Sequence, residues 1–169
     1  MKQIVVIQPS LRKESFTDMI CTIFIQKCLE RHDIELKYID LRDRSLEFCD
    51  GREIWEYNKE LQWDYESIKY AEIVILGFPL YHFSISGVLK NYLDIMSDSL
   101  QDKKIDFLVS AMFDGGEFSY EHIIESLHMK YNTTKALKDT PYILNNMFRD
   151  NELIDIQARK QIQDFASLI

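Results

Sequence analysis

Three short, almost wholly apolar segments constrain the fold of this chain more than any other feature of its sequence. They are residues 3–8 (QIVVIQ), 72–78 (EIVILGF) and 105–110 (IDFLVS), and each is too brief for a core helix. Continuous apolar runs of this length are typical of parallel strands that helices cover on both faces. Residues 34–40 (IELKYID) alternate apolar and polar side chains as an edge strand does, and residues 133–137 (TTKAL) are a weaker fifth candidate.

Amphipathic patterns fill the intervals between these candidate strands. They predict helices at residues 16–31, 53–70, 87–98, 119–130 and 154–168. Ser15, followed three residues later by Asp18, resembles a capping box and places the start of the first helix at residue 16. Strands that alternate with helices form a parallel sheet with helices on both faces. We therefore expect an α/β fold, a three-layer sandwich around a five-stranded parallel sheet, in a single domain over residues 1–169.

The overall composition argues against several classes of protein. Hydrophobic residues make up 46% of the chain and charged residues 28%, which is ordinary for a folded soluble domain. A net charge of −8 with no basic run argues against nucleic-acid binding. No apolar stretch is long enough to span a membrane, and the N-terminus lacks the apolar core of a signal peptide. The three cysteines form no CxxC pair. We expect a cytoplasmic protein with free thiols and no metal site.

The loop after the first strand has the residues of an anion site. In doubly wound sheets, ligands bind at the carboxyl ends of the strands. Here Ser10, Ser15 and Thr17 surround the start of a predicted helix, and Arg12 lies between them. Free N–H groups and the dipole of a helix N-terminus attract anions, and a guanidinium fork suits phosphate. The loop has neither the Walker A nor the GxGxxG pattern. The alternative is that Ser15 only caps the helix and Arg12 is solvated.

The loops after two later strands carry aromatic residues and glycines. Tyr81, His82 and Phe83 directly follow the buried strand that ends near residue 78. Aromatic side chains and free backbone N–H groups at such a place suit a flat heteroaromatic ring. Taken alone, His82 is more often a surface or core residue than a catalyst. The third loop follows Ser110 and contains a glycine pair at 115–116, which permits close backbone approach to a ligand but is common in any turn.

Two of these loops match the motifs of one known family. The first loop reads S-x-R-x-x-S at Ser10, Arg12 and Ser15. The second loop reads P-x-Y-x-x-S-x-x-G-x-L-K-N-x-L-D from Pro79 to Asp94. Together these motifs resemble the NADPH-dependent FMN reductase family, which has a flavodoxin-like fold, and the resemblance extends over essentially the whole chain.

The resemblance implies noncovalent FMN, with hydride passing from NADPH or NADH to FMN and on to a small-molecule acceptor such as a flavin or a quinone. It assigns no catalytic side chain, because FMN carries the chemistry. It also implies a homodimer, to which the apolar side chains of 53–70 and 87–98 would contribute. The residues assigned to cofactor binding are Ser10, Arg12, Ser15, Phe16, Thr17, Pro79, Leu80, Tyr81, His82, Phe83, Ser110, Gly115 and Gly116.

The chain departs from the family pattern at several positions. Pro9 stands where a glycine is usual, and Glu14 puts a negative charge close to the expected phosphate site. Bulky residues at 111–113 replace a glycine-rich stretch, which would narrow the approach of a nicotinamide. The turn at 80–83 has no glycine. We therefore expect this turn to avoid positive φ, to stay fixed and to favour two-electron chemistry.

Three other functions share much of this pattern. A flavodoxin-type carrier also binds FMN but passes single electrons to proteins; its phosphate loop is usually rich in Thr and Ser with a glycine, so Arg12 argues against it. A quinone, azo or chromate reductase would share every residue named above and differ only in its acceptor. A non-enzymatic relative that has lost flavin is consistent with Pro9, Glu14 and the altered third loop.

Overall fold

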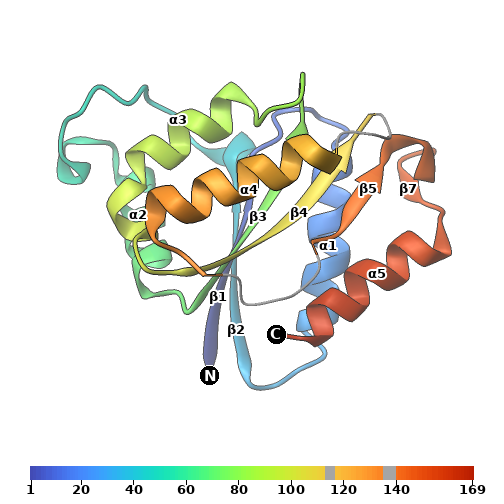
Figure 1. The fold of residues 1–169 in the computed structure, drawn as a ribbon. Helices are drawn as coiled ribbons and strands as arrows, with labels where there is room; N and C mark the ends of the chain where they lie inside the picture. The colour runs from blue at the N-terminus through green and yellow to red at the C-terminus, as the bar shows by residue number, and fades with distance from the viewer. Residues whose placement is uncertain (113–116, 135–139) are drawn as a thin grey trace.

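Parallel strands form the centre of the molecule in the computed structural model of the chain, which describes residues 1–112, 117–134 and 140–169. They are β1 (Lys2–Gln8), β2 (Ile34–Asp40), β3 (Ile73–Leu80), β4 (Lys104–Ala111) and β5 (Tyr142–Leu144). Their order is β2-β1-β3-β4-β5, and every neighbouring pair is parallel (Figure 1). The predicted five-stranded parallel sheet is confirmed, and its first four strands lie within two residues of their predicted bounds.

Helices cover both faces of this sheet, as Figure 1 shows. The helices are α1 (Phe16–Cys28) and α5 (Ile156–Ser167) on one face, and α2 (Lys59–Tyr70), α3 (Gly87–Ile95) and α4 (Glu117–Tyr131) on the other. Alternate residues of β1 divide between two cores. Ile4 and Val6 pack with α1 and α5, whereas Val5 and Ile7 pack with the other three helices. Fully burying one such side chain contributes about 1.5–3 kcal/mol. The predicted three-layer sandwich is confirmed.

The fifth strand does not lie where the sequence predicted it. The described part of the candidate at 133–137 forms no strand: Thr134 makes only an isolated bridge to Lys104, and residues 135–137 of that candidate lie outside the described residues. The sheet ends instead with β5, whose Ile143 pairs with Ser110 and is fully buried at 0% exposure. Thr134 has a β-branched side chain but is exposed, whereas Ile143 fills the core. Burial, which decides strand position more than propensity does, favours β5.

The first helix begins as predicted, but its capping box is only half formed. The Ser15 hydroxyl accepts a hydrogen bond from the backbone N–H of Asp18 at 3.1 Å. The Asp18 carboxylate accepts from Tyr38 and Arg42 instead of completing the box. Helix α1 ends at Cys28, earlier than predicted. The start of α1 is therefore fixed by Ser15, and its first acidic residue is engaged by β2 and the segment after it.

Short elements complete the described part of the chain. They are the 3-10 turns η1 (Leu41–Asp43), η2 (Ile54–Glu56), η3 (Ser97–Leu100) and η4 (Asn145–Met147), and the antiparallel hairpin of β6 (Phe148–Arg149) and β7 (Glu152–Leu153). Phe148 stacks on Phe16 with ring centroids 4.3 Å apart. The C-terminal segment is therefore anchored at the start of α1, beside the carboxyl ends of the strands. No helix within the described ranges is long and apolar enough to cross a membrane.

Candidate functional site

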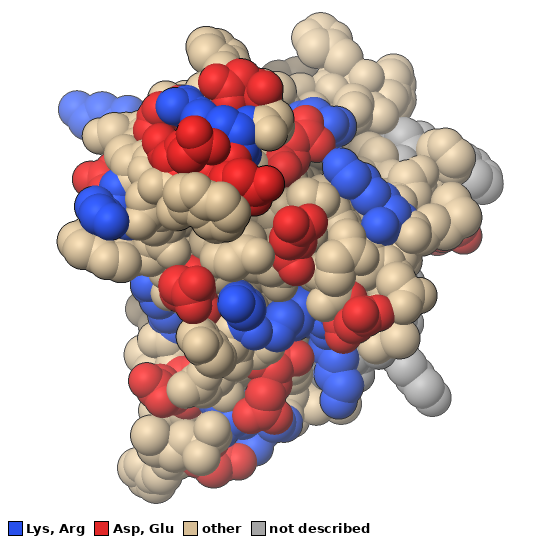
Figure 2. All heavy atoms as spheres, turned by 90° about the vertical axis from the view of Figure 1, so that its left-hand side faces the viewer, with Lys and Arg blue, Asp and Glu red and all other residues tan. Residues whose placement is uncertain are grey.

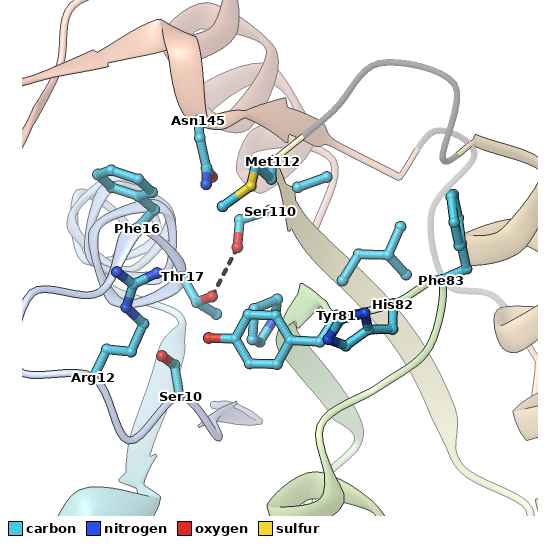
Figure 3. Close-up of a pocket in the computed structure, with 13 residues that line it drawn as sticks. Ser10, Arg12, Phe16, Thr17, Tyr81, His82, Phe83, Ser110, Met112 and Asn145 are labelled. Atoms are coloured by element: carbon cyan, nitrogen blue, oxygen red, sulfur yellow. Dashed lines mark hydrogen bonds between the residues drawn. The ribbon is translucent and has the colours of Figure 1, made fainter.

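A pocket of about 240 Å³ opens at the carboxyl ends of β1, β3 and β4 (Figure 3). The start of α1, the turn after β3, the end of β4 and the η4 turn form its walls. The residues that line it are Ser10, Arg12, Phe16, Thr17, Pro79, Leu80, Tyr81, His82, Phe83, Ser110, Ala111, Met112 and Asn145. Strands β1 and β3 are neighbours in the sheet, and the strand that follows each of them, β2 or β4, lies on its outer side. The pocket therefore lies at the switch point of the sheet, which is the usual ligand position in such folds.

Ten of the thirteen predicted site residues line this pocket together. Ser15 does not line the pocket, because its hydroxyl caps α1. The alternative expected for this residue, a helix cap, is therefore the one observed. Gly115 and Gly116 lie outside the described residues. The pocket also includes Ala111 and Met112, from the stretch that the sequence marked only as a departure from the family pattern.

Asn145 is a pocket residue that sequence reasoning missed. It belongs to η4 and lies across the pocket from Ser10 (Figure 3). No motif surrounds it in the sequence. It reaches the pocket because β5 pairs with the end of β4, which carries the following turn to the same edge of the sheet. Asn145 could have been predicted as a pocket residue only if the sequence had placed β5 correctly.

The polar end of the pocket is formed by buried hydroxyls and a free guanidinium. Ser10, Thr17 and Ser110 are each at most 3% exposed, and the Oγ1 of Thr17 lies 2.8 Å from the Oγ of Ser110. Within the described ranges, no carboxylate pairs with the Arg12 guanidinium, which points into this end of the pocket (Figure 3). A cation beside the N-terminus of α1 attracts an anion, and the hydroxyls offer further hydrogen bonds.

The loop that carries Arg12 does not need the glycine that Pro9 replaces. No residue from 9 to 15 has a positive φ, so the fixed φ of proline is compatible with the loop. The side chain of Gln8 braces it: its Nε2 donates to the carbonyl of Ser10 at 3.1 Å, and its Oε1 accepts from the Ser10 N–H. Glu14 is exposed and does not line the pocket.

The turn after β3 contradicts the expectation that it avoids positive φ. His82 has a φ of 48° and Phe83 a φ of 60°. Tyr81 and Ser84 exchange two backbone hydrogen bonds of 2.9 Å, so the two residues between them form a two-residue hairpin turn. Positive φ at both central positions is the type I′ form of this turn, whose twist matches that of the flanking strands. The backbone N–H groups of the two central residues take no part in these hydrogen bonds, and among the described residues they have no other acceptor, so they can donate to a ligand.

The other end of the pocket is apolar and partly open. Tyr81 is 38% exposed, Met112 59% and Phe83 68%, and Phe16 forms the facing wall. Aromatic and thioether side chains of this kind suit a flat ring. The pocket therefore places side chains suited to an anion beside side chains suited to a flat ring, the combination that a phosphorylated aromatic compound requires. In the part of the chain that the structure describes, no cluster of His, Cys, Asp and Glu could hold a metal ion.

Comparison with known proteins agrees with this geometry. The family described as NADPH-dependent FMN reductase matches residues 2–138. The chain is 29% identical over 140 residues to an NAD(P)H-dependent FAD/FMN reductase of Geobacillus thermodenitrificans, covering 79% of this chain and 73% of that protein. It is 26% identical over 155 residues to an FMN-dependent NADPH-azoreductase of Staphylococcus haemolyticus, covering 83% and 81%. The fold is similar to that of an apo NADH:FMN oxidoreductase, with a TM-score of 0.80 and 17% identity over 99% of this chain and 87% of that one.

Proposed function

The chain belongs to the NADPH-dependent FMN reductase family, and from that premise we propose that its pocket holds FMN and serves hydride transfer from NAD(P)H to a small acceptor. One observation carries this proposal. The Arg12 guanidinium and the buried hydroxyls of Ser10 and Thr17 lie in the same pocket as the aromatic wall of the turn after β3. A phosphate clamp and a ring site within one cavity are the two parts that FMN needs.

The residues divide between the two parts of the cofactor. Ser10, Arg12 and Thr17, with the N–H groups at the start of α1, would hold the phosphate. Residues 79–83 would hold the ring, largely through the N–H groups of the turn. Ser110, whose hydroxyl is hydrogen-bonded to that of Thr17, would lie at the phosphate end, and Gly115–Gly116 remain a prediction. FMN, when bound, supplies the hydride chemistry. We assign no side chain as a general acid or base, and the role of the protein is to bind and orient the reactants.

The experiment that tests the clamp compares two flavins and two basic residues. Arg12→Ala should weaken FMN roughly ten- to hundredfold, because a charge-assisted hydrogen bond is worth about 1.5–3 kcal/mol. Riboflavin, which has no phosphate, should lose little. Lys13→Ala is the matched control, since Lys13 is exposed, carries the same charge and does not line the pocket. Equal losses for both flavins, or an equal effect of Lys13→Ala, would refute the assignment of the phosphate to Arg12.

Two spectra test the cofactor and the activity directly. Protein reconstituted with FMN should show the bands of bound oxidised flavin at about 375 and 450 nm, and NADPH or NADH should bleach them without a protein partner. Protein that binds no flavin would refute the proposal. Bound flavin that neither nicotinamide reduces would favour a carrier of single electrons instead. The acceptor is expected to be a small molecule, because the ring end of the pocket is open but small.

The proposal includes a homodimer. Of the apolar side chains in 53–70, Tyr57 and Leu61 are buried in the protomer's own core, but Trp55 and Trp63 are 68% and 65% exposed. Figure 2 shows that the face over α2 and the loop before it mixes acidic and basic side chains with uncharged ones. Two copies of this face would therefore not repel each other through charges of one sign. Sedimentation should give about twice the 20.1 kDa of one chain. Trp63→Glu should dissociate the pair, while the control Met129→Glu, at an exposed position of α4, should not.

The proposal also places the protein in the cytoplasm. Cys21 and Cys28 are buried and Cys49 is exposed, and all three are free thiols. Free thiols are typical of a reducing compartment. Cell fractionation checks this, and recovery of the protein with a periplasmic or secreted fraction would contradict it.

A further inference from the structure

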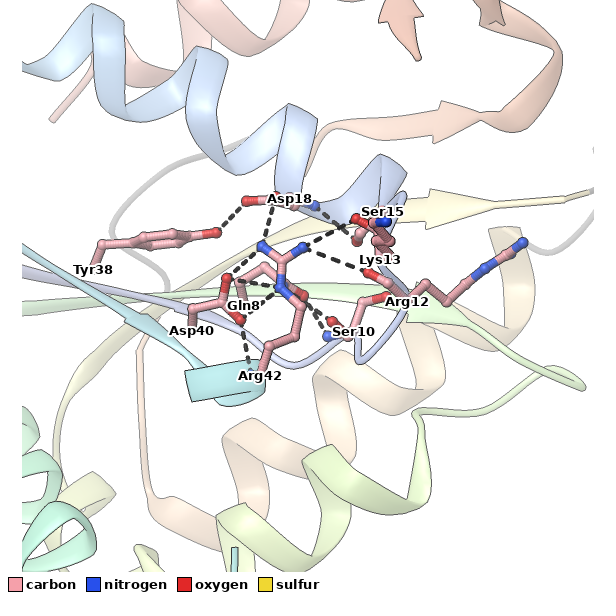
Figure 4. A network of polar contacts seen from close by, with 9 residues as sticks. All are labelled: Gln8, Ser10, Arg12, Lys13, Ser15, Asp18, Tyr38, Asp40 and Arg42. Carbon is pink, nitrogen blue, oxygen red and sulfur yellow. Dashed lines mark hydrogen bonds and ion pairs between the residues drawn. The ribbon is translucent and has the colours of Figure 1, made fainter. Parts of the chain in front are cut away.

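A polar cluster lies behind the Arg12 loop, outside the pocket (Figure 4). Arg42, in the η1 turn after β2, is its centre. Its Nε donates to both carboxylate oxygens of Asp40, at 3.0 and 2.9 Å. Its Nη2 donates to the carboxylate of Asp18 at 2.7 Å and also reaches Asp40. One guanidinium therefore joins the end of β2 to the first turn of α1, the helix whose N-terminus forms the anion site.

Both carboxylates have second partners that fix their positions. The hydroxyl of Tyr38 donates to Asp18 at 2.6 Å, and the Nε2 of Gln8 donates to Asp40 at 3.2 Å. Burial raises the pKa of Tyr38, so its hydroxyl remains a donor to Asp18. Asp18 and Asp40 thus cannot swing into solvent without leaving these donors unpaired.

The remaining edge of the Arg42 guanidinium faces the Arg12 loop itself. Its Nη1 lies 3.5 Å from the carbonyl oxygen of Arg12 and 3.4 Å from that of Lys13, at the long end of the hydrogen-bonding range. In a planar trans peptide, a carbonyl and the following N–H point in opposite directions. Carbonyls held toward Arg42 therefore turn the N–H groups of residues 13 and 14 away from it.

The charges give Arg42 a second role. Asp18, in the first turn of α1, and Asp40, at the end of β2, place two negative charges behind the loop that bounds the proposed phosphate site, and both would repel a phosphate dianion. Arg42 is the cation that contacts both of them. Without it, two uncompensated carboxylates would lie behind the anion site, and Arg12 would have to offset them as well as bind phosphate.

We propose that Arg42 is a positioning residue for the phosphate of FMN: it holds the loop of Arg12 and screens the charges of Asp18 and Asp40. This inference rests on the proposed function. It assigns to η1 a part in cofactor binding although Arg42 itself never touches the pocket.

The test measures FMN and riboflavin affinities for wild type, Arg42→Ala, Arg42→Lys and the double variant Arg42→Ala/Asp18→Asn. Arg42→Ala should weaken FMN by tenfold or more and riboflavin far less. Arg42→Lys keeps the charge but not the fork that bridges two carboxylates, so its FMN affinity should be intermediate. The double variant should recover part of the FMN affinity, because one of the repelling charges is gone. Added salt should raise the FMN affinity of Arg42→Ala relative to wild type, because it screens that repulsion.

A purely structural role predicts different results. If Arg42 only stabilised the fold, both flavins would weaken equally and Asp18→Asn would give no recovery; either result overturns the inference. If Arg42→Ala does not fold by circular dichroism, the selective loss of FMN in Arg42→Lys decides. If wild type prefers FMN to riboflavin and the Arg42 variants keep this preference, the role of Arg42 is refuted but the proposed phosphate clamp is not. Wild type without that preference refutes the proposed phosphate clamp itself.

Discussion

Gly77 lies where α1 crosses β3, and its missing side chain allows the helix and the strand to touch. A Cβ at this position would lie 2.4 Å from the Sγ of Cys21 and 3.3 Å from the Cγ2 of Thr17. Carbon atoms in good contact are about 3.5–4.0 Å apart, so the first contact is a severe overlap. Cys21 is fully buried at 0% exposure and has no solvent to turn into. Gly77→Ala should therefore cost about 1–3 kcal/mol by overpacking.

Urea unfolding and thermal melts followed by circular dichroism measure this loss. For a chain of this length, each kcal/mol lowers Tm by about 2–4 °C. Gly87→Ala is the matched control, because a Cβ at Gly87 meets nothing within 4 Å. Thr17 lines the pocket, so a displaced α1 should weaken FMN binding as well.

A double variant decides whether the sulfur is the cause. Cys21→Ala alone should cost about 0.5–1.5 kcal/mol, because a buried atom is lost. Combined with Gly77→Ala, the total loss should be smaller than the sum by about 0.5–3 kcal/mol, because the added methyl group occupies the space that the sulfur left. Strictly additive losses would refute the reasoning, and so would a Gly77→Ala variant as stable as wild type.

Three further predictions follow from the site and its surroundings. Phe83→Val should be less stable than Phe83→Gly by about 1–2 kcal/mol in urea unfolding, because a β-branched residue is strained at a φ of 60°. Glu14→Gln should tighten FMN by up to about 1 kcal/mol at low salt, and an unchanged titration would mean that this exposed carboxylate faces away. Cys49 should be the one thiol that a maleimide labels in the folded protein at neutral pH, since burial raises the pKa of Cys28 to about 11; rapid labelling of a second thiol would contradict the structure.

Local patterns in the sequence predicted the parts of the molecule that depend on neighbours in the chain. The apolar runs at 3–8, 72–78 and 105–110 predicted three central strands, because a strand that is buried on both faces has apolar side chains on both. Ser15 predicted the start of α1, because a helix cap is a contact between residues three positions apart. The motif around Arg12 predicted one wall of the pocket, since strand, loop and helix follow one another there.

Tertiary structure alone decided the parts that depend on distant residues. Ile143 entered the sheet because it fills a core built by other segments, and Asn145 reached the pocket with it. Phe83 took a positive φ because it is the second central residue of a two-residue hairpin turn of the type I′ form, whatever its own preference. Arg42 reads in the sequence as an ordinary polar residue after a strand. Its contacts with Asp18 and the Arg12 loop exist only because parallel pairing of β1 and β2 brings the ends of both strands to one edge of the sheet.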